Sequence, residues 1–316
     1  MLTEIIKCHG SGNEFVMIDL TAENAAAPRD LGAFARELCG REESGRCDGA
    51  LYVALVDGLY AMRMFNPDGS EAEMCGNGIR CVARLVDERY LRAESFTLLS
   101  GGRRYPACRA ERIAPEIPTY GVDIEVRTSS DDFGFARGAE RFVAEVIPSL
   151  ESPLRFTALN LGNPHIVAEV ERIDMRELER MGEAVARLGE DFPRGINVSM
   201  YERRGPQSLF AATFERGAGI TYSCGTAMTA CSTAATLTGA CREGEPIEVY
   251  NRGGMVRCLC RASGGRIVTR LTGNATYEWF GTVEHDASGI AAVTRTENRD
   301  DETAAYDRFV RSINAQ

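Results

Sequence analysis

The stretch Met74-Cys-Gly-Asn-Gly-Ile-Arg-Cys81 has a counterpart later in the chain, Ser223-Cys-Gly-Thr226. In both places a Cys-Gly pair follows a glycine-containing loop and precedes a helical pattern. Each helix is followed by a predicted β-hairpin, which turns at Gly101-Gly102 in the first copy and at Gly253-Gly254 in the second. The spacing from cysteine to glycine pair is 26 residues in one copy and 29 in the other. Two copies of a Cys-helix-hairpin unit predict a duplicated α/β domain; the alternative is a coincidence among common strand and helix patterns.

The two predicted helices differ in character. In the first, apolar residues between Ile79 and Val86 recur on one side, whereas Arg80, Arg84 and Asp87 fall on the other, which is typical of an amphipathic helix. The second lies in the uncharged stretch 217–241, which is rich in Ser, Thr and Gly and has few large aliphatic side chains. That composition fits a buried helix of small residues better than a membrane span.

Length and charge limit the partners of the chain. Its 316 residues predict two medium domains or one large one. With 46 acidic and 36 basic residues the formal charge is −10, so we expect binding neither to nucleic acid nor to a membrane. Lys7 is the only lysine, which argues against a Schiff base with pyridoxal phosphate, and we expect no cofactor.

The eleven cysteines are expected to be reduced thiols. The first residues lack the long apolar core of a secretory signal, which predicts a cytoplasmic protein whose thiols stay reduced. Cys258 and Cys260, with only three histidines in the chain, give weak support for zinc, and we predict no metal site. Cys75 and Cys81 are predicted to be separate helix residues rather than a disulfide.

Each repeat begins with a cysteine, Cys75 or Cys224, at the start of a helix. The N–H groups there and the positive end of the helix dipole favour thiolate over thiol, so the pKa of a cysteine in this place should fall. Gly76 and Gly225 leave the same N–H groups open to a carboxylate. Two such helix starts facing each other would hold one α-carboxylate and place a sulfur on each face of the carbon that bears it.

Inverting a stereocentre by proton transfer needs a base on one face of the carbon and an acid on the other. Two cysteines in opposite protonation states supply both without a cofactor, so the pattern favours inversion of a stereocentre that bears a carboxylate. Two alternatives remain open. Both cysteines could be ordinary buried residues of a non-catalytic binder. The run Ser223–Thr226 could instead carry a hydrolase nucleophile, although a cysteine in that role needs a histidine partner.

These residues resemble those of the diaminopimelate epimerase family, whose enzymes interconvert L,L- and meso-diaminopimelate without a cofactor. The resemblance follows the family's order and covers most of the chain up to about residue 280. It rests on the segments His9–Phe15 (HGSGNEF), Phe65–Glu71 (FNPDGSE), Met74–Cys81 (MCGNGIRC), Gly162–His165 (GNPH), Gly195–Val198 (GINV), Glu215–Gly219 (ERGAG) and Ser223–Thr226 (SCGT).

The resemblance implies that Cys75 and Cys224 are the two acid/base residues. It implies that a substrate carboxylate binds at the two helix starts and that Asn13 lies near the reacting centre. A zwitterionic distal end needs a cationic fork, amides and an acceptor, although asparagines are also common in turns. The residues implied for the reacting carboxylate are Gly76, Asn77, Gly225 and Thr226, and those implied for the distal amino-acid end are Asn66, Asn163, Asn197, Glu215 and Arg216.

The implied fold is α/β (α+β), with two pseudo-symmetric domains. Each is a curved, mostly antiparallel sheet wrapped around a central helix, and the active site lies in the cleft between them. We place the N-terminal domain at 1–126, with 274–316 returning to it, and the C-terminal domain at 127–273, because the polar stretch 127–138 suits a crossing. The charged, Ala-rich end of the chain predicts a helix over Asp301–Ile313 in a peripheral tail. A homodimer and a place in lysine and peptidoglycan synthesis follow from the resemblance alone.

Departures from the family's pattern bear on the substrate. Ile220 stands where a glutamate is usual, Arg46 and Cys47 occupy positions that are typically smaller or apolar, and the helix start after Cys224 reads Gly-Thr-Ala. Racemases of proline and of histidine resemble the same fold and remain an alternative. The run Cys-Gly-Asn at the first motif, where proline racemases generally have Cys-Gly-His, favours a substrate with two amino-acid ends.

Overall fold

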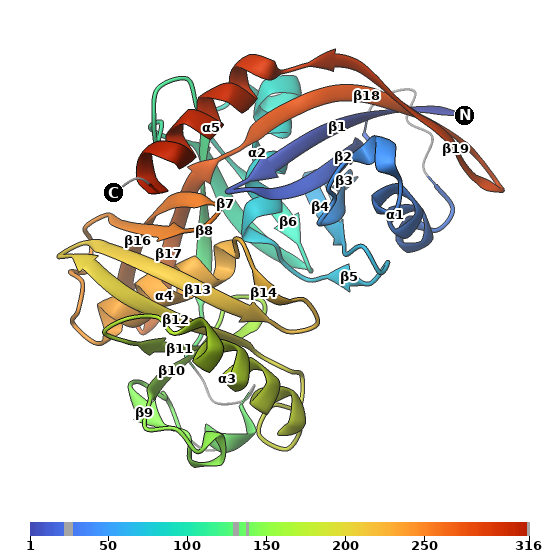
Figure 1. Ribbon diagram of the computed structural model, residues 1–316. Coiled ribbons are helices and arrows are strands. Elements are labelled where there is room, and N and C mark those ends of the chain that lie inside the picture. Colours follow the sequence, from blue (N-terminus) through green and yellow to red (C-terminus); the bar gives the residue numbers. More distant parts are fainter. Residues whose placement is uncertain (22–27, 129–132, 137–138, 315–316) are drawn as a thin grey trace. The chain divides into compact units, whose positions relative to one another are not determined.

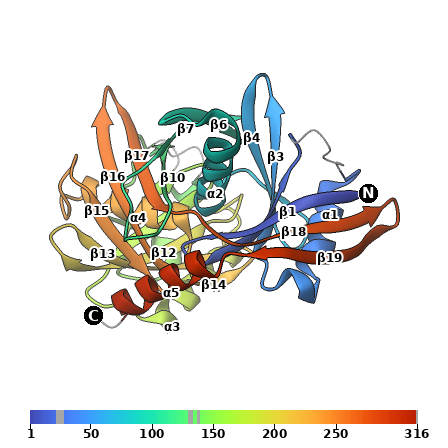
Figure 2. The same cartoon turned by 90° about the horizontal axis from the view of Figure 1, so that it is seen from above.

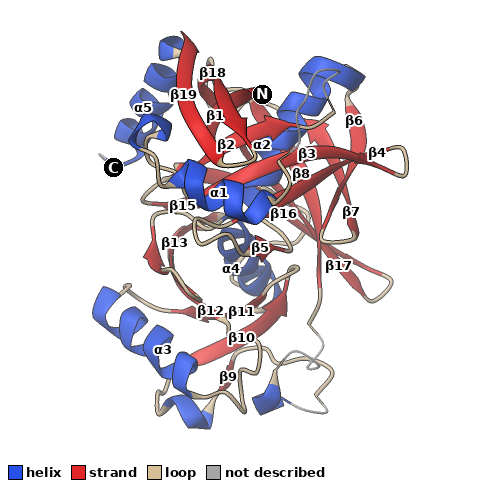
Figure 3. Cartoon of the chain, turned by 90° about the vertical axis from the view of Figure 1, so that its right-hand side faces the viewer, coloured by secondary structure: helices blue, strands red, loops and turns tan. Residues whose placement is uncertain are grey.

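The computed structural model describes residues 1–21, 28–128, 133–136 and 139–314, so part of the predicted crossing at 127–138 lies outside the described residues. Strands dominate the fold, and the predicted mixed α/β class is confirmed (Figure 3). The chain divides into two compact units. The first consists of Met1–Val122 with Thr272–Gln316, and the second of Asp123–Leu271.

The first unit contains a mixed sheet. Its strands are β1 (Leu2–Gly10), β2 (Asn13–Asp19), β3 (Gly49–Val56), β4 (Leu59–Phe65), β5 (Glu71–Ala72), β6 (Ser95–Ser100), β7 (Arg103–Arg109), β8 (Thr119–Val126), β18 (Thr276–Asp286) and β19 (Gly289–Asn298). Hydrogen-bonded neighbours follow the order β19-β18-β1-β2-β3-β4-β6-β7-β8. The β2–β3 and β4–β6 pairs are parallel, and the others in this series are antiparallel. Strands β1 and β18 lie side by side although they come from opposite ends of the chain (Figure 1).

The second unit has a sheet of the same kind. Its strands are β9 (Glu145–Val146), β10 (Arg155–Asn160), β11 (Pro164–Glu169), β12 (Asn197–Gly205), β13 (Ser208–Glu215), β14 (Gly219–Thr221), β15 (Ile247–Asn251), β16 (Gly254–Ser263) and β17 (Arg266–Asn274). Neighbours follow the order β9-β10-β11-β12-β13-β15-β16. Here the parallel pairs are β11–β12 and β13–β15.

The two units repeat the same order of elements. In the first, α1 (Leu31–Cys39) links the parallel strands β2 and β3, and α2 (Gly76–Val86) follows the short strand β5. In the second, α3 (Met175–Arg187) links β11 and β12, and α4 (Gly225–Leu237) follows the short strand β14. Both predicted hairpins are present as β6–β7 and β15–β16. The repeat therefore extends beyond the Cys-helix-hairpin unit and includes the strand pairs that precede it.

Each unit has a central helix packed against its own sheet. Helix α2 contacts β1–β4 and β7, and α4 contacts β11–β13, β15 and β16. Every residue of α2 is buried, so the side that carries Arg80 and Arg84 does not face solvent, and Asp87, which follows the helix, is buried as well. The charged side chains find partners inside the unit instead. The Asp87 carboxylate, for example, accepts hydrogen bonds from Tyr120 and Arg109.

Arg80 is the largest fully buried side chain in the part of the chain that the structure describes. Its guanidinium donates to the backbone carbonyls of Gly76, at 2.9 Å, and of Asn274, at 3.2 Å, and to the hydroxyl of Ser11, at 3.1 Å. The planar fork of arginine suits three acceptors spread around it. Arg80 therefore ties the first turn of α2 to the β1–β2 turn and to the segment that returns from the second unit.

Helix α4 is the buried helix of small residues that the sequence predicts. Its residues from Gly225 to Ala235 are all buried. Three hydroxyl groups bond carbonyls of the helix itself: Thr229 donates to Gly225 at 2.8 Å, and Ser232 and Thr233 donate to Thr229 at 2.9 and 2.8 Å. Among the described residues, no helix is long and apolar enough to cross a membrane.

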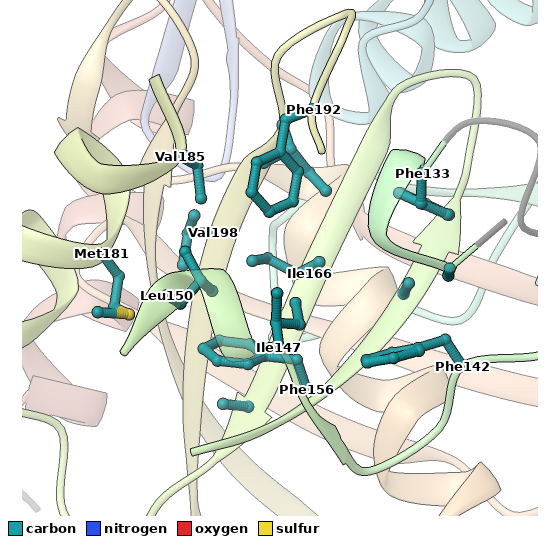
Figure 4. Close-up of a cluster of buried hydrophobic side chains, with 14 of the residues drawn as sticks. Phe133, Phe142, Ile147, Leu150, Phe156, Ile166, Met181, Val185, Phe192 and Val198 are labelled. Atoms are coloured by element: carbon teal, nitrogen blue, oxygen red, sulfur yellow. The ribbon is translucent and has the colours of Figure 1, made fainter. Parts of the chain in front are cut away.

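A hydrophobic core fixes the strands of the second unit that carry site residues (Figure 4). Phe156, Ile166 and Val198, on the neighbouring strands β10, β11 and β12, are fully or almost fully buried, and Met181 and Val185 of α3 belong to the same cluster. Burying side chains of this size contributes roughly 1.5–3 kcal/mol each. The start of β11 is thereby held beside the start of β12.

The end of the chain forms helix α5 (Asp300–Asn314), which confirms the predicted terminal helix. The prediction that the tail is peripheral is wrong. Helix α5 packs against β18 (Figure 2), and Glu302 and Tyr306 are buried. The guanidinium of Arg84 binds the Glu302 carboxylate with two hydrogen bonds of 2.5 and 2.9 Å, and it also lies 3.7 Å from the centre of the Tyr277 ring. The tail thus anchors helix α2.

We predict that Glu302→Ala lowers the free energy of unfolding by about 3 kcal/mol, because the buried Arg84 cation loses its buried carboxylate partner and keeps only the half-exposed Glu88. Urea unfolding followed by circular dichroism measures the change. The matched control is Glu116→Ala, since Glu116 pairs with Arg308 on the surface, where their side chains are 71% and 59% exposed. That control should change stability by less than about 1 kcal/mol. Equal effects of the two substitutions would contradict an anchoring role for Glu302.

Candidate active site

Cys75 and Cys224 occupy the same place in the two units. Each is the residue that caps the start of the central helix: φ and ψ are −136° and 110° at Cys75 and −125° and 109° at Cys224. These extended angles turn the chain from the preceding loop into the first helical turn. Both helices begin at the next residue, so the predicted position of the cysteines at helix starts is confirmed.

Cys75 is half-buried, and two neighbours within its unit contact its sulfur. The Sγ atom accepts a hydrogen bond from the N–H of Gly78 at 3.4 Å, and its S–H group donates to Asn13 Oδ1 at 3.8 Å. Asn13 is the first residue of β2 and follows Gly12, whose φ of 75° lets the chain turn sharply between β1 and β2. The predicted proximity of Asn13 to Cys75 is thus present in the structure.

A loop before β3 supports Asn13. Asp48 Oδ2 accepts hydrogen bonds from Asn13 Nδ2 at 3.1 Å and from the N–H of Glu14 at 2.8 Å. The residue before it, Cys47, forms a disulfide with Cys39, whose Cα lies 5.0 Å from that of Cys47. The expectation that all cysteines are reduced is therefore wrong for this pair, because the end of α1 packs next to the loop. The remaining nine cysteines are free.

Cys224 has a different environment and is only 8% exposed. Its sulfur lies 3.4 Å from the hydroxyl oxygen of Thr226. Burial raises the pKa of the Cys224 thiol well above its ordinary value, and the nearby charge of Glu215 raises it further. The predicted fall in pKa is therefore wrong for this cysteine, since burial and a neighbouring carboxylate outweigh the helix start. Glu215 itself accepts a hydrogen bond from the Thr221 hydroxyl at 2.6 Å.

His165 joins the predicted site residues of the second unit, and the sequence analysis assigned it no role. Its Nε2 lies 3.0 Å from Asn163 Oδ1, 3.2 Å from Thr226 Oγ1 and 3.4 Å from Asn197 Nδ2. Burial and the positive charge of Arg216 lower its pKa to about 3, so the ring is neutral at physiological pH. The signal in the sequence was the run Gly162–His165, in which a histidine stands two residues after an asparagine at a strand start.

The remaining predicted residues divide between the units. The N–H of Arg216 donates to Asn197 Oδ1 at 3.0 Å, which adds Arg216 to the polar network around His165. In the first unit Gly76 and Asn77 are the first two residues of α2, and both are buried. The Asn66 side chain bonds the Ser70 hydroxyl within the turn after β4, at 2.9 Å.

The predicted site residues of each unit include polar side chains and one thiol. Among the described residues, no group of three or more His, Cys, Asp or Glu side chains is arranged to hold a metal ion. The groups present are suited to proton transfer by sulfur and to binding carboxylate and ammonium groups through amides, N–H groups, a guanidinium and a carboxylate.

Comparison with known proteins identifies relatives. A family model described as diaminopimelate epimerase matches residues 5–112 and 157–278. A diaminopimelate epimerase from Clostridium acetobutylicum is 36% identical over 313 residues, which cover 96% of this chain and 93% of that relative.

Solved structures share the fold at low sequence identity. A phenazine biosynthesis protein of the PhzF family from Bacillus anthracis matches with a TM-score of 0.64 and 14% identity, covering 90% of this chain and 99% of that one. A hydroxyproline epimerase from Agrobacterium vitis, solved with trans-4-hydroxy-L-proline, matches with a TM-score of 0.61 and 14% identity, covering 90% of this chain and 92% of that one. These two likenesses establish a common fold alone.

Two buried histidines, His9 and His165, should make the stability of the protein depend on pH. Burial lowers the pKa of His9, as of His165, to about 3. The unfolded chain therefore binds more protons between about pH 6.5 and pH 3, and stability falls as the pH is lowered through this window. For each of the two histidines, the free energy of unfolding should fall by about 1 kcal/mol between pH 6 and pH 5. Urea unfolding at both values measures the loss, and His165→Gln should remove its share. An unchanged pH dependence in this variant would show that His165 is not buried in neutral form.

Proposed function

The chain belongs to the diaminopimelate epimerase family, and from this premise we propose that it interconverts L,L- and meso-2,6-diaminopimelate by exchanging the proton on one α-carbon. The observation that carries the proposal is the pair of cysteines in equivalent positions. Each caps the central helix of its own unit, and the two have unlike surroundings. A homodimer, a cytoplasmic location and a role in lysine and peptidoglycan synthesis are further parts of the proposal.

The proposed reaction consists of two proton transfers, each between the substrate carbon and one of the two cysteines. One cysteine, as thiolate, takes the α-proton; the electron pair of the broken C–H bond is left on the carbon and spreads into the adjacent carboxylate. The other cysteine, as thiol, donates its proton to the opposite face of the same carbon. No electrons leave the substrate, so the reaction needs no oxidant or cofactor.

The environment of Cys224 supports an assignment of starting states. Because burial and the Glu215 charge raise the pKa of its thiol, Cys224 begins as the acid. Cys75 is then the base, and its sulfur is assisted by the N–H of Gly78. In the reverse direction the two exchange roles, since the same transition state must be crossed.

The helix starts supply the electrostatic support that the reaction requires. The α-proton of an amino acid is very weakly acidic, so most of the acceleration must come from groups that stabilise the charge developing on the carboxylate side. We propose that the N–H groups of the first turns, at Gly76, Asn77, Gly225 and Thr226, bind that carboxylate. Exclusion of water would strengthen each of these interactions.

The distal amino-acid end is proposed to bind the polar side chains of the second unit together with Asn66. The guanidinium of Arg216 offers a fork for a carboxylate, the amides of Asn163 and Asn197 offer donors and acceptors, and Glu215 offers an acceptor for an ammonium group. His165 links the two amides and Thr226. The side chains of Asn163, Asn197, Thr226 and His165, with the backbone of Arg216, therefore form one polar network within the second unit.

A deuterium-exchange experiment tests the substrate. The purified protein is incubated in D2O with L,L-diaminopimelate, and in parallel with L-proline and L-histidine, without added cofactor. We expect deuterium at the α-carbon of diaminopimelate and formation of the meso isomer. Label only in proline or histidine would assign the chain to another racemase on this fold. Label in none of the three would leave a cysteine hydrolase or a non-catalytic binder.

We predict that Cys75→Ala and Cys224→Ala each lower turnover by at least roughly 100-fold, because each removes a proton-transfer group. The melting temperature should stay close to that of the unmodified protein. Cys108→Ala is the matched control, since Cys108 is a free, partly exposed cysteine of the first unit, and it should keep full activity. Near-normal turnover in either site variant would remove that cysteine from its proposed role.

A further inference from the structure

Neither the sequence nor the family resemblance assigns a role to Asp48. It lies directly before β3, and its Oδ2 atom is an acceptor for both the Asn13 side chain and the N–H of Glu14. The N–H of Asp48 donates in turn to the carbonyl of Glu14 at 2.7 Å. Asp48 is therefore bonded to the first two residues of β2 by backbone and side chain together.

The contact with Asp48 fixes which way the Asn13 amide faces. An ionised carboxylate only accepts hydrogen bonds, so the amide nitrogen of Asn13 must be the atom that faces Asp48. The amide oxygen then points the other way, toward the sulfur of Cys75 at 3.8 Å. This orientation follows from hydrogen-bond chemistry and does not depend on distinguishing nitrogen from oxygen by position alone.

Three consecutive residues hold the Asp48 loop in place. The ammonium group of the buried Lys7 donates to the carbonyl of Arg46 and forms an ion pair with Glu14 at 3.0 Å. Cys47 is bound to Cys39 through the disulfide. The Arg46 guanidinium reaches Asp48 Oδ2 at 3.0 Å. A carboxylate held at so many points keeps a fixed position relative to Asn13.

We propose that Asp48 is a positioning residue for proton transfer at Cys75. It holds the Asn13 amide so that Oδ1 accepts a hydrogen bond from the S–H group formed when Cys75 takes the α-proton. This inference rests on the proposed function. The hydrogen bond is absent while the sulfur is a thiolate and forms as the proton arrives, so it stabilises the later part of the reaction more than the start.

Loss of Asp48 should have two opposite effects on Cys75. The freed amide can turn and present its NH2 group to the sulfur, which stabilises the thiolate before reaction. A stabilised thiolate forms more readily and is more available to an alkylating reagent, but it is a weaker base. Faster alkylation together with slower turnover is therefore the expected signature.

The first experiment compares Asp48→Ala with Asp48→Asn. The alanine variant should lower kcat roughly 3- to 10-fold, with a much smaller change in KM, in line with the loss of one hydrogen bond. The asparagine variant should stay close to normal, because the N–H of Glu14 draws its amide oxygen into the place of Oδ2. Equal losses in both variants would show that the charge of Asp48 matters rather than its hold on Asn13.

The second experiment is a double-mutant cycle with Asn13→Ala. If Asp48 acts through Asn13, Asp48→Ala should cause no further loss of kcat once Asn13 is alanine. Additive losses would overturn the inference and indicate a general effect on the loop. Asp286→Ala is the matched control, because Asp286 also binds a backbone N–H and a side chain in a turn of the same unit; it should leave all readouts unchanged.

The third experiment needs no turnover. Alkylation of Cys75 by iodoacetamide is followed by peptide mass spectrometry across pH without substrate. Asp48→Ala should accelerate alkylation near neutral pH, and Asp48→Asn and the double variant should not. If the unmodified protein introduces no deuterium into diaminopimelate, the proposed function is rejected. If Asp48→Ala leaves the rate of alkylation unchanged, only the positioning of Asn13 by Asp48 is rejected.

Discussion

The N–H groups at the start of a buried helix are the constraint on which each unit depends. A helix that lies against the inside of its own sheet cannot leave these donors to bulk water, so the chain must provide acceptors or leave a place for an anionic ligand. Cys75 meets part of this need by accepting the N–H of Gly78. The first turn of α2 is also closely packed. A β-carbon on Gly10 would lie 2.8 Å from the carbonyl oxygen of Asn77, and one on Gly78 would lie 2.8 Å from a methyl group of Leu51. The helix start is therefore packed too closely for a side chain at Gly10 or Gly78.

Duplication of this arrangement permits two chemically different sulfurs in one chain. The asparagines at the equivalent strand starts, Asn13 and Asn163, both follow a glycine with positive φ, so the two turns present amides in the same way. Their partners differ: the first faces a thiol, and the second faces Thr226 and His165. Cys224 is the more buried of the two cysteines, and burial raises the pKa of its thiol. A shared backbone geometry with unlike neighbours is what a reaction with one acid and one base requires.

Local features of the sequence predicted local structure well. The Cys-Gly pairs marked the starts of α2 and α4, and the glycine pairs marked the hairpin turns, because these signals act within a few residues. Features that depend on distant partners were not predictable in this way. Arg80 and Arg84 are buried because their partners, Asn274 and Glu302, come from the returning segment. The raised pKa of Cys224 and the neutral His165 reflect burial, and the Cys39–Cys47 disulfide reflects the packing of α1 on a loop.

The two units also differ in how the chain builds them. The second is one continuous segment, whereas the first needs both ends of the chain. The N–H of Ser11 donates to Asn274 Oδ1 at 2.7 Å, and the ring of His9 packs edge-on against Tyr306 of α5, with centroids 4.6 Å apart. Contacts so distant in sequence close a long loop, and this closure costs entropy. The turn that carries Asn13 to Cys75 is therefore held in part by the returning segment and the last helix. The end of the chain has the composition of a charged tail, but it helps to hold the start of helix α2.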